Sequence, residues 1–325
     1  MAATNPQHDR SPSLREPTRR SRAADHLRRH FGDPAVKRLL PAAALVVVVA
    51  LAAGIVIGRL TGDATGALPA EGEPGVAADG HIHGGGGDTS AEGPLVTGQS
   101  MSLGGYTFVP DTDRFEPGPA QFTFHISDGF GTPVTDYTVL HDKPMHLFAM
   151  RLDLSGYQHV HPDMSDDGTW TIELDFTRPG PWRVIADFAV TEGETARPVT
   201  LGVDVTVPGD YRPVDLPEPV NPVSVGGDDV SVDFTPTVRV TSPLLVTIAV
   251  DGRPAQLEPY LGAFGHLVAL RTGDVGFLHV HPDVERVGDA LRFWLTIPSR
   301  GDYRLYLEFK TRGEVKRAEF TLHVP

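Results

Sequence analysis

Cysteine is absent from all 325 residues of the sequence. Its absence excludes disulfides, thiolate metal ligands and cysteine nucleophiles, so any folded domain depends on its hydrophobic core. Outside one apolar run, the 3.6-residue period of an amphipathic helix is also missing. No serine stands in a nucleophile-elbow context, and no glycine-rich loop precedes a helical pattern. These absences argue against serine hydrolases and phosphate-loop enzymes.

Positive charge is scarce beyond the N-terminal region, and the formal net charge is −14. Residues 1–38 carry nine Lys or Arg against four acids, which leaves 19 basic and 38 acidic residues in the rest of the chain. A chain segment with this excess of negative charge repels the phosphate backbone of a nucleic acid. We therefore expect no nucleic-acid partner.

The one long apolar run is LLPAAALVVVVALAAGIVIG, residues 39–58. Its 20 uncharged residues would form a helix about 30 Å long, the thickness of the hydrocarbon core of a bilayer. The basic residues before it favour a cytoplasmic tail, residues 1–38, and an extracellular remainder. The alternative is a cleaved signal peptide, although the run exceeds the usual length and no convincing A-x-A site follows. We expect a single-pass protein of the cell membrane that contacts the lipid bilayer through residues 39–58.

Composition divides the rest of the chain into two linkers and two repeats. Residues 59–95 are rich in Gly, Ala and Pro and predict a disordered linker. This linker contains HIHGGGGD, which is either a small metal-binding cluster or an accident of the spacer. Residues 96–208 and 229–325 alternate apolar and polar residues in short runs, which is typical of half-buried strands. A proline-rich linker, residues 209–228, separates them.

Short strands at this spacing, over about 100 residues in each repeat, predict an all-β fold of two tandem immunoglobulin-like β-sandwiches after one transmembrane helix. The expected strands are Gln121–Ile126, Trp170–Phe176, Trp182–Val190, Val199–Val207, Val230–Phe234, Leu244–Val250, Leu291–Ile297, Tyr303–Phe309 and Ala318–Val324.

Two stretches that lie 120 positions apart are nearly the same. HLFAMRLDLSGYQHVHPD begins at His146 and HLVALRTGDVGFLHVHPD begins at His266. Ten of the 18 positions are identical, and three histidines keep their spacing in both copies. The similarity continues from RPGPWRVIADF, residues 178–188, to SRGDYRLYLEF, residues 299–309. The repeated unit is therefore a whole domain.

The repeated histidines predict one metal site in each repeat. Residues i and i+2 of a strand point to the same face, which brings together both histidines of each HVH segment. A hairpin that turns through Ser155 and Gly156 can return the first histidine to the same place. Three imidazoles suit Cu(II), Zn(II), Ni(II) or Fe(II), and we expect copper, with zinc second. The predicted ligands are His146, His159 and His161 in repeat 1, and His266, His279 and His281 in repeat 2.

Each motif ends in an aspartate, Asp163 or Asp283. This residue either accepts a hydrogen bond from the other ring nitrogen of a ligand or belongs to a turn beside the proline. The histidines themselves have two further interpretations, a structural role in the fold and another polar role.

A metal-dependent enzyme is one alternative function. His279, His281 and Glu285 resemble the metal motif of cupins, with His323 as a distal ligand, but the glycine pattern of cupins is absent. A zinc hydrolase would need an open coordination position and a general base, for which the sequence offers Glu258 and Asp136.

The other alternative is a structural or adhesive ectodomain that binds no metal. Such a protein would keep its histidines apart, or bonded to backbone carbonyls. Of these possibilities we expect the metal-binding protein and not an enzyme.

The stretches LEPYLGAFGHLVALRTGDVGFLHVHPD and HLFAMRLDLSGYQHVHPD resemble a group of membrane-anchored or secreted proteins of high-GC Gram-positive, actinobacterial type that carry an HVHP-containing β-sandwich. More loosely, the repeats are similar to the YtkA-like and cupredoxin-like extracytoplasmic domains linked with copper handling. The resemblance covers residues 125–325. It implies exported sandwiches with histidine metal sites, and a copper transporter or another membrane metal-handling protein as partner. The lack of cysteine excludes a blue-copper site.

Overall fold

A computed structural model describes residues 96–278, 280–283 and 286–325 of the chain. The described residues all belong to one compact unit. The predicted cytoplasmic tail, transmembrane helix and first linker, together with HIHGGGGD, lie outside the described residues. No helix in the part of the chain that is described is long and apolar enough to cross a membrane.

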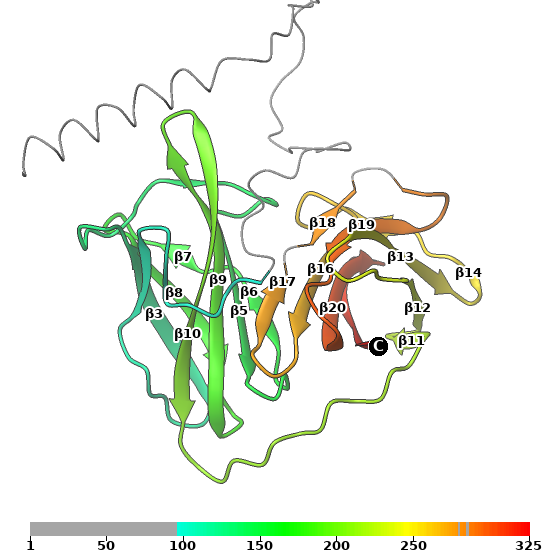
Figure 1. Cartoon of the computed structure of the whole chain (residues 1–325), viewed down its shortest axis with the longest axis horizontal. Helices are drawn as coiled ribbons and strands as arrows, with labels where there is room; N and C mark the ends of the chain where they lie inside the picture. Colours follow the sequence, from blue (N-terminus) through cyan, green and yellow to red (C-terminus); the bar gives the residue numbers. More distant parts are fainter. Residues whose placement is uncertain (1–95, 279, 284–285) are drawn as a thin grey trace, which may run out of the picture. The chain divides into compact units, whose positions relative to one another are not determined.

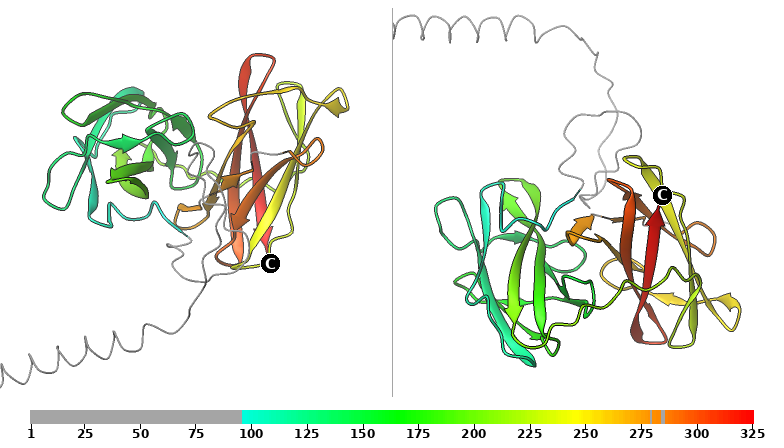
Figure 2. Two further views of the ribbon diagram at one scale, coloured as in Figure 1. Left: turned by 90° about the horizontal axis from the view of Figure 1, so that it is seen from above. Right: turned by 60° about the horizontal axis from the view of Figure 1, so that its bottom comes forward.

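Repeat 1 consists of strands that pair into two antiparallel sheets (Figures 1 and 2). The strands are β1 (Ser102–Leu103), β2 (Tyr106–Pro110), β3 (Pro119–Ser127), β4 (Tyr137–Thr138), β5 (Met145–Arg151), β6 (Gln158–Val160), β7 (Asp163–Met164), β8 (Thr169–Asp175), β9 (Gly180–Glu192) and β10 (Thr195–Val207). One sheet has the order β1-β2-β3-β8-β7, and the other has the order β10-β9-β5-β6 with β4 paired to β9.

Repeat 2 also forms two antiparallel sheets. Its strands are β11 (Val223–Val225), β12 (Asp228–Asp233), β13 (Thr241–Val250), β14 (Arg253–Pro254), β15 (Leu257–Glu258), β16 (His266–Arg271), β17 (Gly276–Leu278), β18 (His281–Pro282), β19 (Leu291–Thr296), β20 (Gly301–Thr311) and β21 (Glu314–Val324). One sheet has the order β11-β12-β13-β19-β18 with β14 on β13, and the other has the order β15-β20-β16-β17 with β21 on β20.

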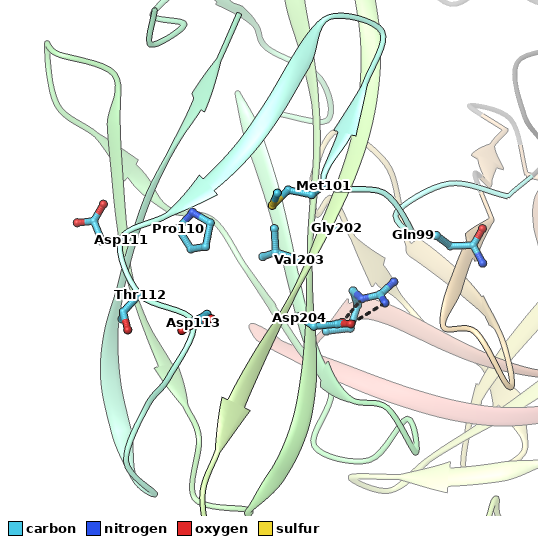
Figure 3. A pocket seen from close by; sticks show the side chains of 10 residues that line it. Gln99, Met101, Pro110, Asp111, Thr112, Asp113, Gly202, Val203 and Asp204 are labelled. Atoms are coloured by element: carbon cyan, nitrogen blue, oxygen red, sulfur yellow. Dashed lines mark hydrogen bonds and ion pairs between the residues drawn. The ribbon is translucent and has the colours of Figure 1, made fainter. Parts of the chain in front are cut away.

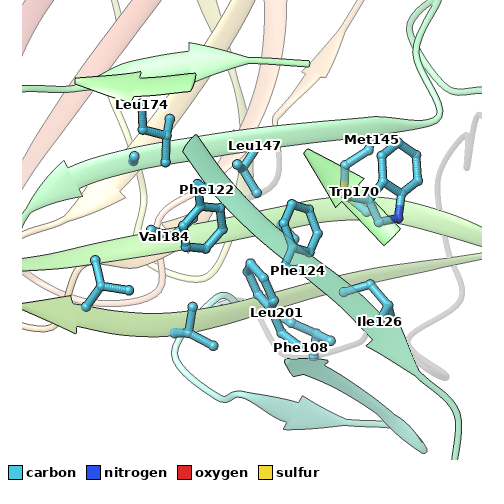
Figure 4. Packing of buried hydrophobic residues seen from close by; sticks show 14 of the residues in the cluster. Phe108, Phe122, Phe124, Ile126, Met145, Leu147, Trp170, Leu174, Val184 and Leu201 are labelled. Atoms are coloured by element: carbon cyan, nitrogen blue, oxygen red, sulfur yellow. The ribbon is translucent and has the colours of Figure 1, made fainter. Parts of the chain in front are cut away.

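The core of each repeat lies between its two sheets. In β3 the apolar residues Phe122, Phe124 and Ile126 are buried, while the residues between them are only partly buried. From the other sheet, Met145 and Leu147 of β5 enter the same cluster (Figure 4). This alternation is the period-2 pattern that predicted the strands, and each predicted strand overlaps an observed one. The all-β class and the two repeated sandwiches are thereby confirmed.

The predicted proline-rich linker, residues 209–228, is shorter in the structure. β11 lies inside that range and pairs with β12, so that Val225 faces Asp228. Gly226 and Gly227 form the two-residue turn between them, both with positive φ (55° and 80°). Two such residues are what a type I′ hairpin turn requires. The density of proline before this hairpin concealed it in the sequence.

Strands in the middle of two sheets, one in each repeat, are buried on both faces, which is unusual for antiparallel sheets. Every residue of β5 is buried. Alternate residues of β5 and β9 enter the core of repeat 1, alternate residues of β16 and β20 enter the core of repeat 2, and the residues between them form a third cluster. This inter-repeat cluster contains Phe148, Met150, Leu154, Tyr157, Ile185, Val268, Leu270, Val275, Phe277 and Tyr306.

Equivalent positions of the two repeats supply most of the inter-repeat cluster. Phe148 corresponds to Val268 in the repeat alignment, and Met150 corresponds to Leu270. Tyr157 of repeat 1 stacks on Tyr306 of repeat 2, with ring centroids 3.8 Å apart, and the Tyr306 hydroxyl donates a 2.7 Å hydrogen bond to the carbonyl of Leu154. The outer faces of equivalent sheets are therefore in contact.

The close approach of β10 to the segment before β1 depends on a glycine. A Cβ built on Gly202 would lie 1.9 Å from the carbonyl oxygen of Gly98, and the Gly202 amide donates a 2.9 Å hydrogen bond to Ser100. We expect Gly202→Ala to lower the free energy of unfolding by about 1–3 kcal/mol, because the backbone must move to admit a methyl group. Urea unfolding would measure this, with Gly129→Ala as the control, since the nearest atom there is 3.7 Å away. Equal stability of the two variants would contradict the close contact.

Candidate metal centre

The candidate centre lies beside the inter-repeat cluster and takes residues from both repeats. His146 is in β5, His159 is in β6, His161 follows two positions later, and His266 begins β16. Val160 packs against the core of repeat 1. The residue between the two histidines of this HVH segment therefore points inward. The flanking histidines share the opposite face, with ring centroids 4.7 Å apart.

The ring nitrogens of these histidines converge. His146 Nδ1 lies 3.0 Å from His159 Nε2 and 3.2 Å from His161 Nε2. The His266 ring stacks on the His146 ring, with centroids 5.5 Å apart and planes 4° apart. His146, His159 and His266 each offer a ligand atom within 4.8 Å of the others. Nitrogens about 2 Å from one ion lie roughly 3 Å from one another, so these separations are of the right order for a shared metal.

Two protons in the centre are placed by neighbouring acceptors. His146 Nε2 lies 3.1 Å from the carbonyl oxygen of Leu140, and His159 Nδ1 lies 2.8 Å from a carboxylate oxygen of Glu308. Carbonyl and carboxylate oxygens accept hydrogen bonds, so both of these ring nitrogens donate. In neutral rings the remaining nitrogens, His146 Nδ1 and His159 Nε2, then face each other as two lone pairs. His161 Nε2 lies 3.2 Å from the same nitrogen of His146. The partner of the His146 lone pair is therefore a proton donated by His159 or His161, or a metal ion.

The environment keeps three of the rings neutral at pH 7. Burial, and then repulsion from neighbouring histidines, lowers the pKa of His146 to about 4 and the pKa of His161 to about 3. Burial and the same repulsion place the pKa of His266 well below its ordinary value. Neutral imidazole is the form that binds a metal.

His266 also carries a polar atom without a partner. Its Nδ1 is buried and has no hydrogen bond within the described residues. Leaving a buried polar atom unpaired costs about 1–3 kcal/mol. Such an atom beside other imidazole nitrogens fits a site that holds a cation.

A further histidine, His141, lies in the turn before β5. Its ring centroid is 6.0 Å from those of His146 and His266. His141 and Asp142 have positive φ values of 50° and 63°, a conformation that His and Asp tolerate better than most residues. This turn also directs the Leu140 carbonyl toward His146. The sequence analysis did not assign His141 to the site. Its one signal was that His141 occurs in repeat 1 only, since repeat 2 has Leu261 at the equivalent position.

The structure brings together the three histidines predicted for repeat 1 and adds a fourth from repeat 2. His266 was assigned to a site in repeat 2, yet it lies with His146 and His159 of repeat 1. The reason is that the two motif-bearing sheets contact each other, which a repeat in the sequence does not reveal. His279 and the side chain of His281 lie outside the described residues, so a second site remains a prediction.

The aspartate of the first motif is exposed and is not buried with the histidines. Asp163 is exposed in β7, and Asp283 accepts a 2.7 Å hydrogen bond from Arg292. Glu308 and the Leu140 carbonyl hold the ring nitrogens instead. No sequence pattern in repeat 2 pointed to Glu308, because the histidine that it contacts, His159, belongs to repeat 1.

The residues that an enzyme would need are placed elsewhere. Glu258 accepts a hydrogen bond from the Gly313 amide, and Asp136 is exposed. His323, the cupin-like distal ligand, lies 2.6 Å from Asp302 and is mostly exposed. Glu285 lies outside the described residues.

A hollow on repeat 1 is lined by none of these histidines (Figure 3). Its lining consists of Gln99, Met101, Pro110, Asp111, Thr112, Asp113, Arg183, Gly202, Val203 and Asp204. The Arg183 side chain, the cation of this lining, is paired with Asp204 there.

The repeat boundaries agree with a known family. The family described as "Domain of unknown function (DUF8832)" matches residues 101–206 and again residues 223–325. These two matches follow the two sandwiches and together include more than half of the chain. The chain belongs to the DUF8832 family. Each repeat is one DUF8832 domain, which confirms the internal duplication. No curated protein matches the chain.

Several solved structures resemble the DUF8832 pair in part. The adhesin FdeC of Escherichia coli is 16% identical with a TM-score of 0.21, over 72% of this chain and 66% of that one. A DUF4785 family protein of Legionella pneumophila is 11% identical with a TM-score of 0.23, over 67% and 55%. InvD of Yersinia pseudotuberculosis is 12% identical with a TM-score of 0.21, over 68% and 57%. The chain thus spans less than two thirds of each, and TM-scores this low carry no argument about function.

Proposed function

We propose that this DUF8832 protein binds a transition-metal ion, copper first and zinc second, through His146, His159 and His266, with His161 beside them. The observation that carries the proposal is the convergence of three imidazole rings, whose ligand atoms all lie within 4.8 Å of one another. His146 Nδ1 and His159 Nε2 are 3.0 Å apart, and the other nitrogens of these two rings contact the Leu140 carbonyl and Glu308. The partnerless Nδ1 of His266 supports it. Imidazole nitrogens are favoured ligands of copper and zinc.

When bound, the ion would accept the lone pairs of these ring nitrogens. The chain's own part is to hold the rings neutral, fix which nitrogens carry protons and exclude water from the buried rings. The carboxylate in the centre, Glu308, already accepts hydrogen bonds from His159 and Tyr260, which supports the proposal of a binding site.

The cellular setting that we propose follows from the sequence. Residues 39–58 would anchor the protein in the membrane, with residues 1–38 in the cytoplasm and both sandwiches outside. Metal buffering, or delivery to a copper transporter or another membrane metal-handling protein, would suit that position. An immunoglobulin-like or cupredoxin-like topology and the resemblance to YtkA-like domains belong to the same proposal.

The second proposal is a structural or adhesive ectodomain that binds no metal. Its support is the all-β architecture of two tandem domains. In that case a proton shared between His146 and His159 would replace the metal. This alternative predicts that the cluster stabilises the contact between the repeats and retains no ion.

Metal stoichiometry separates the two proposals. Full-length protein in mild detergent would be loaded with Cu(II) or Zn(II), dialysed at pH 7.5 and assayed for metal, beside His146→Ala/His159→Ala. We expect one equivalent fewer in the variant than in the wild type. The difference is the informative quantity because any metal held by histidines outside the cluster is the same in both proteins. Equal content in both proteins would support the ectodomain without metal.

A further inference from the structure

We propose that Glu308 and Tyr260, both from repeat 2, are the positioning residues of the metal centre. Glu308 accepts the Nδ1 proton of His159, and Tyr260 holds Glu308 in place. This inference rests on the proposed function and adds that repeat 2 sets the orientation of a ligand in repeat 1.

The contacts form a short relay across the two repeats. One carboxylate oxygen of Glu308, Oε2, lies 2.8 Å from His159 Nδ1 and 3.1 Å from the Tyr260 hydroxyl. A phenol hydroxyl donates to a carboxylate, so this oxygen accepts from both groups. The side chain of His159 is 0% exposed and that of Glu308 is 9% exposed. Water therefore does not compete for the relay, and charge-assisted hydrogen bonds of this kind are the strong ones.

The relay determines which nitrogen of His159 is available to an ion. With its proton on Nδ1, the ring keeps Nε2 as a lone pair, 3.0 Å from His146 Nδ1. Without the carboxylate, the proton would move to Nε2 and be donated to His146. That tautomer satisfies both rings without a metal and closes the site. Carboxylates that hold ligand histidines in this way contribute about 10–100-fold to metal affinity.

The equivalent positions of repeat 1 do not form the same contact with a histidine of repeat 2. Asp187 corresponds to Glu308 in the repeat alignment, and it accepts a 2.7 Å hydrogen bond from Thr200 instead of a histidine. Leu140 corresponds to Tyr260 and has no hydroxyl to donate. The support is therefore directed one way, from repeat 2 to repeat 1.

The test compares Glu308→Leu and Tyr260→Phe with the wild type in the full-length protein. Asp187→Asn is the matched control, because it also removes one negative charge near the cluster but leaves the His159 contact intact. Protein labelled with 15N-histidine and freed of metal would report the protonation of each ring nitrogen by NMR, with His159→Gln assigning the signal. Affinity for Zn(II) would be measured by competition with a chelator, and circular dichroism would confirm folding.

In the wild type and in Asp187→Asn we expect Nδ1 of His159 to carry a proton. In Glu308→Leu it should move to Nε2, with Zn(II) affinity lower by about 10–100-fold, and Tyr260→Phe should show a smaller loss. An unchanged tautomer and unchanged affinity in folded Glu308→Leu would overturn the inference. If Glu308→Leu does not fold, Tyr260→Phe decides by the same two measurements. Absence of Zn(II) binding in the wild type would instead overturn the proposed function, and the NMR result would still show whether Glu308 holds the proton.

Discussion

His266→Ala is expected to weaken binding of Zn(II) or Cu(II) by at least about 100-fold, although His266 lies 120 positions from His146 in the sequence. Loss of a residue that only supports a ligand costs about 10–100-fold, and loss of a ligand itself costs more. The His266 ring stacks on that of His146 and lies 4.8 Å from that of His159. A centre that uses both repeats therefore loses a ligand when repeat 2 is changed.

The measurement is competition with a chelator of known affinity, on full-length protein at pH 7.5. His323→Ala serves as the control, because that histidine is also in repeat 2 but is exposed and bonded to Asp302. If each repeat held its own independent site, His266→Ala would leave tight binding at His146 and His159 untouched. Observation of that outcome would show that the shared centre is wrong.

The metal-free protein is expected to lose stability as the pH falls from about 6.5 toward 4. The pKa of His146 is lowered from 6.5 to about 4, chiefly by burial. Between these values the unfolded chain takes up a proton that the folded protein does not, so acid favours unfolding. The stabilisation is present in full above pH 6.5 and is lost as the pH falls to the folded value. For His146 alone the loss amounts to about 3 kcal/mol.

Urea unfolding in the presence of EDTA, at several pH values between 7.5 and 4, would measure this loss. Carboxylates also titrate in acid, so the informative quantity is the difference between the wild type and His146→Gln. We expect the wild type to lose about 3 kcal/mol more than the variant over that interval. His125→Gln, outside the cluster, should follow the wild type. Parallel curves for the wild type and His146→Gln would show that His146 does not remain neutral in the folded protein.

The strands of both sandwiches were predictable because their apolar residues alternate. Phe122, Phe124 and Ile126 of β3 follow the period of 2 that a sheet with one buried face imposes. β11 was not predicted, because its hairpin at Gly226 and Gly227 follows a run of prolines that resembles a linker. Short strands bordered by prolines give little periodic signal.

The candidate site was predicted in its residues but not in its assembly. The spacing of His159 and His161 was sufficient to place both rings on one face, and Val160 does point into the core. The position of His266 could not be derived, because it depends on how two sheets pack and not on any local pattern. Glu308 could not be identified from the sequence for the same reason, since its partner His159 lies 149 positions away.

The contact between equivalent faces has a consequence for how the two halves diverge. Two copies of one domain that meet through the same face would, as separate chains, form a two-fold symmetric dimer, in which every substitution appears twice. In a single chain each position changes once. His141 therefore has Leu261 as its counterpart, and Glu308 with Tyr260 has Asp187 with Leu140. One half can specialise in supplying imidazoles while the other supplies the support that orients them, an asymmetry that identical subunits do not permit.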